Sequence, residues 1–98
     1  MSKYQLNWFA QAAKDFKKLD NSQKIQVSRG LNKIATMGTQ IGKPLIGNLI
    51  GLREIKLLRL GLRIVFAQNG NQIDVIDIIA VGKRADGEVF DVVEKRIK

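Results

Sequence analysis

Residues 52–66 read LREIKLLRLGLRIVF, and this stretch decides how the chain folds. It predicts two strands, 52–59 and 62–67, joined by a turn at residues 60–61, because apolar and charged residues alternate along both runs. The alternation predicts that Lys56 and Arg63 face the same side of the sheet. Cations fixed on a sheet are suited to gripping a phosphate at defined geometry. The alternative is that they are edge or solvent-facing charges that protect the sheet from aggregation.

The overall charge predicts a polyanionic partner. Seventeen Lys and Arg against nine Asp and Glu give the 98-residue chain a formal net charge of +8. Nucleic acid, an acidic protein and an anionic membrane all fit such a charge. The membrane is the weakest of the three, because no apolar run approaches the ~20 residues of a spanning helix. The length suits one hydrophobic core, so we expect a single domain over residues 1–98.

Missing residue types restrict the chemistry. The chain has no His and no Cys, which excludes imidazole catalysis, thiolate metal sites and disulfide partners. The absence of Cys also favours a cytoplasmic protein. No phosphate-binding glycine loop is present. Asp74 and Asp77 are three apart in a predicted strand and therefore point to opposite faces, so we expect no metal and no other cofactor.

The remaining pattern predicts an α+β fold. A short strand at 3–7 precedes an apolar helical stripe that ends near Leu19, and a second helix follows with caps at 20–22 and a stop at Gly38. A loop over 39–51 leads to three antiparallel strands, the last at 73–81, and an amphipathic helix closes the chain at 88–97. The prediction is therefore an N-terminal strand and helical hairpin packed on an antiparallel sheet of about four strands, with a C-terminal helix.

Cations also lie along the two predicted N-terminal helices. Such residues form either an ordinary solvated face or a dedicated binding surface, and the first interpretation is the more common. The residues concerned are Lys14, Lys17, Lys18, Lys24, Arg29 and Lys33.

Three segments together resemble a known family. They are KPLIGNLIGLREIK at 43–56, GLRIVF at 61–66 and VGKRADGEVF at 81–90. In this order and spacing they resemble the RelE branch of the RelE/ParE superfamily, the toxin halves of bacterial type II toxin–antitoxin pairs. The resemblance covers essentially the whole chain and implies the RelE/ParE-like microbial RNase fold.

The resemblance implies an activity and partners. RelE-type toxins are small cytoplasmic endoribonucleases that enter the ribosomal A site, cut the mRNA there and inhibit translation. Cleavage uses the 2′-hydroxyl of the RNA as nucleophile and needs cations rather than a metal. The implied partners are a cognate antitoxin protein, mRNA and the ribosome with its 16S rRNA.

The family's cationic catalytic positions fall on Lys56, Arg63 and Arg84. Arg63 and Arg84 suit bidentate contact with the scissile phosphate, and Lys56 is a candidate base. The resemblance further implies Phe90, Arg53 and Lys83 as substrate-binding residues.

Two positions depart from the family pattern. Glu54 stands where well-known members have Lys, and it is either a second candidate base or the ion-pair partner of Lys56. Phe90 stands where the family has Tyr, so it keeps a face for base stacking but has no hydroxyl; packing in the core is its other interpretation. Two alternative functions therefore stay open: a ParE-like toxin that poisons DNA gyrase without cutting RNA, and a degenerate, non-toxic relative that only binds RNA or an antitoxin.

Overall fold

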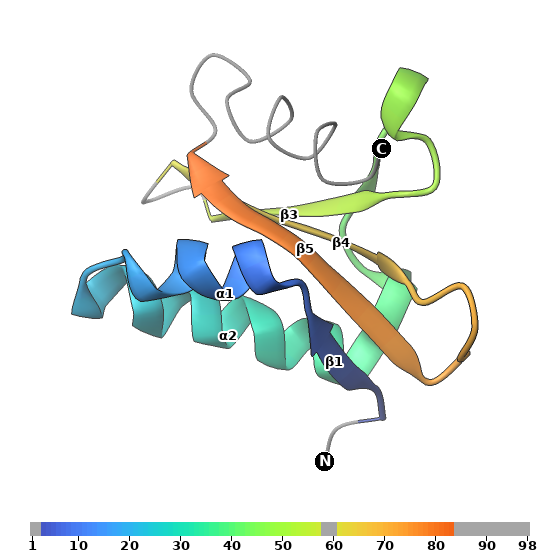
Figure 1. Cartoon of the computed structure of the whole chain (residues 1–98), viewed down its shortest axis with the longest axis horizontal. Coiled ribbons are helices and arrows are strands. Elements are labelled where there is room, and N and C mark those ends of the chain that lie inside the picture. The colour runs from blue at the N-terminus through green and yellow to red at the C-terminus, as the bar shows by residue number, and fades with distance from the viewer. Residues whose placement is uncertain (1–2, 58–60, 84–98) are drawn as a thin grey trace.

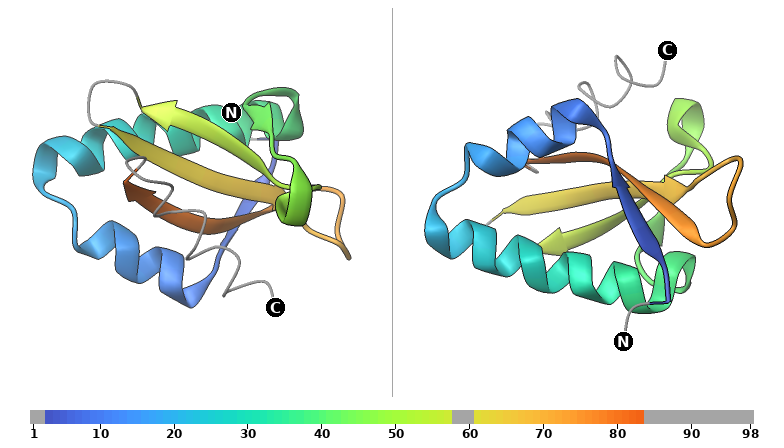
Figure 2. Two further views of the ribbon diagram at one scale, coloured as in Figure 1. Left: turned by 90° about the horizontal axis from the view of Figure 1, so that it is seen from above. Right: turned by 60° about the horizontal axis from the view of Figure 1, so that its bottom comes forward.

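The computed structural model describes residues 3–57 and 61–83. Along this part of the chain lie β1 (Gln5–Trp8), α1 (Ala10–Lys17), α2 (Asn21–Met37), the 3₁₀ turn η1 (Gly38–Gln40), β2 (Lys43–Pro44), the 3₁₀ turn η2 (Gly47–Leu49), β3 (Arg53–Leu57), β4 (Leu62–Gln68) and β5 (Val75–Lys83). Both helices pack on one side of the sheet (Figure 1, Figure 2). The α+β prediction is confirmed, and the helix predicted at 88–97 lies outside the described residues.

The sheet differs in two details from the expected antiparallel sheet of about four strands. It has five strands in the order β1-β5-β4-β3-β2. The additional strand, β2, is only two residues long and pairs with β3 inside the segment predicted as a loop. The first strand pairs with β5 in parallel, from Gln5 opposite Val75 to Trp8 opposite Ile78, so the sheet is mixed.

The helices begin and end close to where the sequence predicts. Asp20 caps α2: its carboxylate accepts from the Gln23 amide at 2.8 Å, and the Gln23 side chain accepts in return from the Asp20 amide. Such a capping box satisfies two amides that a helix start leaves without partners. Gly38 ends α2 at a φ of 60°, which glycine adopts without strain. The first helix ends at Lys17, two residues before the predicted Leu19.

The core has two layers because the sheet is covered on both faces. On the helix side, the apolar positions of α2 meet Leu62, Ile64 and Phe66 of β4. On the other side, Leu49 packs against alternate residues of β4, namely Val65 and Ala67. Period-two alternation along β4 thus supplies both layers. The buried apolar positions of α2 are Val27, Leu31, Ile34 and Ala35, as the sequence predicts.

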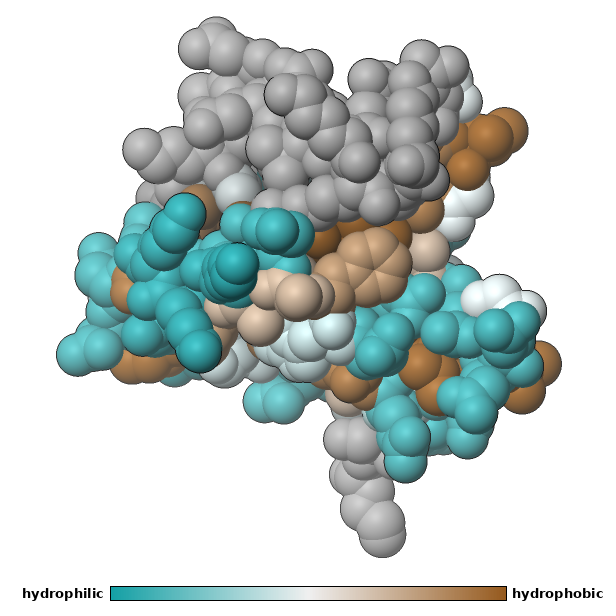
Figure 3. All heavy atoms as spheres, viewed as in Figure 1, coloured by the Kyte–Doolittle hydropathy of each residue, from teal (hydrophilic) through white to brown (hydrophobic). Residues whose placement is uncertain are grey.

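The surface reflects this layering. Hydrophilic side chains gather over α1, while apolar side chains protrude beside η2, where Ile46 and Ile50 are 86% and 79% exposed (Figure 3). Neither described helix combines the length and apolar character that a membrane span requires.

Candidate active site

The pairing of β3 with β4 brings two cations face to face. The strands are antiparallel, and their register places Lys56 directly opposite Arg63. Opposite residues of an antiparallel pair point to the same side of the sheet, with their Cβ atoms roughly 4.5–5.5 Å apart. The prediction that Lys56 and Arg63 share a face is therefore confirmed. This is the face away from the helices, since Ile64 and Leu62 of β4 point to the helix layer.

A buried carboxylate completes the cluster. Glu54 lies two residues before Lys56 on β3 and therefore on the same face. Its Oε2 accepts from Nη1 of Arg63 at 2.6 Å, and the two side chains are only 3% and 12% exposed. Of the two roles considered for Glu54, ion pairing is observed, but the partner is Arg63 and not Lys56. We refer to Glu54, Lys56 and Arg63 as the β3–β4 cluster.

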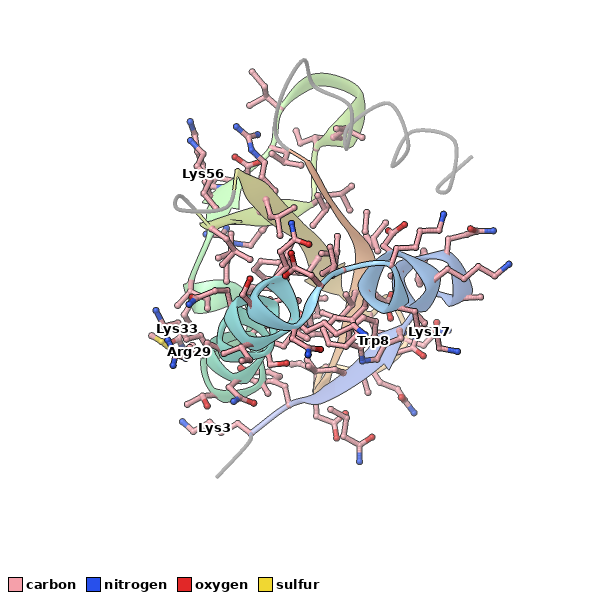
Figure 4. The ribbon with its side chains drawn as sticks, turned by 90° about the vertical axis from the view of Figure 1, so that its left-hand side faces the viewer. Lys3, Trp8, Lys17, Arg29, Lys33 and Lys56 are labelled. Atoms are coloured by element: carbon pink, nitrogen blue, oxygen red, sulfur yellow. The ribbon has the colours of Figure 1, made fainter. Side chains whose placement is uncertain are left out.

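Lys56 is the exposed member of this cluster. In Figure 4 it projects from β3 toward the solvent, on the same side of the view as Arg29 and Lys33 of α2. A molecule that approaches this face therefore meets the Lys56 ammonium before the half-buried guanidinium of Arg63. The arrangement offers one mobile cation and one fixed cation, both of which attract a phosphate.

Similarity to known proteins was found in solved structures. No family model and no curated protein matches the chain. A doubly substituted form of the E. coli toxin RelE in the free state is 28% identical, with all of both chains covered and a TM-score of 0.78. The isolated E. coli RelE toxin is 29% identical over 97% of this chain and 99% of that chain, with a TM-score of 0.71.

The chain is similar to RelE toxins in both fold and sequence. A third solved structure, the toxin–antitoxin complex RelBE2 from Mycobacterium tuberculosis, is 23% identical over 88% of this chain and 97% of that chain, with a TM-score of 0.71, and shows the fold alone. Together these similarities support a toxin of a toxin–antitoxin pair.

The structure separates Arg53 from Glu54, Lys56 and Arg63. Arg53 lies opposite Phe66, on the helix-facing side of β3. Its guanidinium donates to the carbonyl oxygens of Ile41 at 2.9 Å and of Gly42 at 2.8 Å. These contacts tie the turn before β2 to β3. Arg53 is therefore a structural residue here and lies outside the β3–β4 cluster.

Of the remaining predicted site residues, the structure describes the backbone of Lys83, at the end of β5. The backbone of Lys83 pairs with Leu62, and Gly82 pairs with Arg63, so β5 runs beside the cluster. Arg84 and Phe90 lie outside the described residues. Within residues 3–57 and 61–83, no three acidic, histidine or cysteine side chains gather into a group that could hold a metal ion.

The Glu54–Arg63 pair is the feature that sequence reasoning missed. The sequence does indicate that Glu54 and Arg63 can meet, because alternation along the two strands puts both residues on one face. Choosing between Lys56 and Arg63 as the partner of Glu54 required the strand register. Lys56 and Glu54 are neighbours along one strand, whereas Arg63 reaches Glu54 diagonally across the strand pair.

Proposed function

We propose that the chain is the toxin of a type II toxin–antitoxin pair and an endoribonuclease that cuts mRNA in the ribosomal A site, so inhibiting translation. The observation that supports this is the direct opposition of Lys56 and Arg63 on one sheet face. Protection of a sheet edge explains Arg63 poorly, because β4 is paired with β3 on one side and with β5 on the other, whereas β2 pairs with β3 only at Arg53 and Glu54.

The proposed reaction uses the RNA's own hydroxyl. The 2′-oxygen loses its proton and bonds to the adjacent phosphorus, and the bond from phosphorus to the 5′-oxygen breaks as that oxygen takes up a proton. The products are a 2′,3′-cyclic phosphate and a 5′-hydroxyl. Negative charge grows on the phosphoryl oxygens in the transition state, where a fixed guanidinium is most effective. Arg63 supplies that guanidinium, and Arg84 is proposed as a second one from the family resemblance.

Lys56 is the proposed substrate-contacting group at the 2′-oxygen. Glu54, the other base considered, is buried against Arg63, so its Oε2 is already engaged. Lys56 is exposed and flexible enough to meet the ribose.

The test is primer extension on a reporter mRNA in a reconstituted translation reaction, with and without ribosomes. Lys56→Ala is the decisive variant, because Lys56 is exposed and its removal leaves the fold intact. Lys17→Ala on α1 is the matched control, since it removes an exposed lysine far from the cluster in sequence and on another element. We expect ribosome-dependent cuts by the wild type and by Lys17→Ala, and a loss of at least about 100-fold in Lys56→Ala.

The opposite results are equally informative. Cuts of equal rate in Lys56→Ala would contradict the assigned site. No cuts by the folded wild type would contradict the nuclease function, and a DNA gyrase supercoiling assay would then test the ParE-like alternative.

The proposed partners follow from charge and similarity. Solved structures similar to this chain include RelBE toxin–antitoxin complexes from E. coli and M. tuberculosis. We therefore propose a cognate antitoxin whose acidic or amphipathic segment complements the +8 charge. The ribosome, with its 16S rRNA and bound mRNA, is the second proposed partner and places the activity in the cytoplasm.

A further inference from the structure

Glu54 is an unusual residue for its position. Among the residues that the structure describes, it is the one charged side chain that is buried. Taking a carboxylate out of water is costly unless a charged partner and hydrogen bonds compensate. An apolar residue at this position would avoid the cost, as Val65 does directly opposite on β4. A carboxylate here is therefore best explained by what it does to Arg63.

The geometry indicates what that effect is. Arg63 lies directly opposite Lys56, so its backbone does not point at Glu54. The guanidinium nevertheless turns along the sheet and places Nη1 2.6 Å from the Glu54 carboxylate. An arginine side chain has about 2 kcal/mol of rotamer entropy to lose when it is fixed. Glu54 fixes it in advance, before any substrate is bound.

Charge balance gives Glu54 a second effect. Lys56 and Arg63 are like charges in directly opposed positions, an arrangement that is destabilising in a sheet. The carboxylate of Glu54 offsets one of the two charges. Both cations can then occupy the same face in the absence of RNA. Transition-state stabilisation is greatest when the charged groups are already oriented and need no rearrangement during the reaction.

We propose that Glu54 is a positioning residue, which holds the Arg63 guanidinium for contact with the scissile phosphate, and that it does not serve as the base. This inference rests on the proposed nuclease function. It gives Glu54 and Lys56 different roles, although the two residues lie on the same face of β3. Glu54 acts through Arg63, and Lys56 contacts the RNA.

The first test is a double-mutant cycle on ribosome-dependent cleavage. Glu54→Gln keeps the size and one acceptor oxygen but removes the charge, and Arg63→Lys keeps a positive charge but removes the planar fork. We expect Glu54→Gln to lower kcat about 100-fold through misplacement of the guanidinium, with little change in KM. In the Arg63→Lys background the same substitution has little further effect, because the group that Glu54 orients is gone. Asp77→Asn on β5 is the matched carboxylate-to-amide control and leaves kcat unchanged.

A base role for Glu54 gives a different pattern. Glu54→Gln would then lower the rate to the same extent in both backgrounds. That result would overturn the positioning role. A purely structural role would reduce the folded fraction of Glu54→Gln without changing kcat per folded molecule, and this would also overturn it.

The second test does not depend on cleavage. In ¹⁵N-labelled protein, rotation about the Cζ–Nη bonds of an arginine is slowed when a carboxylate holds it, and separate Nη signals are seen. We expect slowed rotation for Arg63 in the wild type, with the signals assigned by their absence in Arg63→Lys, and fast rotation in Glu54→Gln. Fast rotation in the wild type would overturn the inference even if the protein cleaves RNA. Slowed rotation in a wild type that cuts no mRNA would overturn the proposed function, and with it the catalytic purpose of the pair.

Discussion

At the level of single residues, the burial of Glu54 determines how much stability the protein loses when Arg63 is replaced. The two side chains are 3% and 12% exposed and 2.6 Å apart. We expect Arg63→Ala to lower the free energy of unfolding by about 3–5 kcal/mol, because an uncompensated carboxylate is left in the sheet. Lys56→Ala is expected to stay within about 0.5 kcal/mol of the wild type. Urea denaturation followed by circular dichroism measures both values.

The same measurement has an internal control. Adding Glu54→Gln to Arg63→Ala removes the stranded charge and should recover part of the lost stability. Equal stability of Arg63→Ala and Lys56→Ala would mean that the pair is not buried in solution. Because Lys56→Ala is expected to keep its stability and Arg63→Ala is not, Lys56 is the better position at which to test activity.

Residue-level prediction from the sequence succeeded where it depended on strand period alone. Alternation placed Lys56 and Arg63 on one face, and the register confirms it. The family resemblance implied Arg53 as a substrate-binding residue, and the structure places it apart from these two cations. Arg53 is a cation on the same strand, but its odd spacing from Lys56 puts it on the helix side, where it binds the carbonyl oxygens of Ile41 and Gly42.

At the level of elements, the start of α2 makes stability depend on pH. Hydrogen bonds from the Gln23 amide, and then from the Ser22 hydroxyl, hold the pKa of Asp20 below its usual range. Because the folded state has the lower pKa, the stabilising effect is present above the unfolded pKa. It is lost as the pH falls through the folded value. We expect wild type to be more stable than Asp20→Asn at neutral pH and to lose that advantage below about pH 4.

Thermal unfolding at a series of pH values measures this difference. Asn is an equally good N-cap, so Asp20→Asn isolates the charge from the hydrogen bond. A stability difference that is the same at every pH would show that the charge of Asp20 has no role in the cap.

Two features at the end of α2 favour glycine at position 38: the backbone conformation and the closeness of Tyr4. Gly38 has φ 60° and ψ −133°, and a Cβ at this position would lie 2.6 Å from the Tyr4 ring. We expect Gly38→Ala to destabilise the protein by at least about 1–3 kcal/mol from the backbone alone. Gly51→Ala is the control, because Gly51 also has a positive φ but nothing within 4 Å. Chemical denaturation of both variants compares them, and equal losses would mean that the Tyr4 contact costs nothing.

Elements with strong local signals were predictable, and elements that depend on distant partners were not. Both helices have apolar stripes, and α2 also has its own cap at Asp20, so the predicted ends of the helices lie close to the observed ones. The parallel pairing of β1 with β5 joins Gln5 to Val75, and no local pattern in either segment indicates the direction. The strand β2 has only two residues, too few to show alternation, and it exists because β3 offers it backbone partners.

At the level of the whole molecule, the fold places the β3–β4 cluster on the sheet face opposite the two helices. The two helices bury the other face against Leu62, Ile64 and Phe66. Helix cations such as Lys24, which lies over the Phe16 ring at 5.9 Å from its centroid, take part in packing the helical hairpin. In the proposed function, the +8 charge attracts a polyanion over the whole surface and the β3–β4 cluster makes the specific contact.

The salt dependence of RNA binding separates these two contributions. Each phosphate contact with a single strand releases counterions and adds about −0.7 to the slope of log K against log salt concentration. If Lys56 contacts a phosphate, Lys56→Ala should make that slope less negative by about 0.7, and Lys56→Arg, which keeps the charge, should leave it unchanged. Fluorescence anisotropy with an uncleavable 2′-deoxy oligonucleotide, over roughly 50–200 mM salt, measures the slopes. An unchanged slope in Lys56→Ala would mean that Lys56 makes no phosphate contact and that other cations hold the RNA backbone.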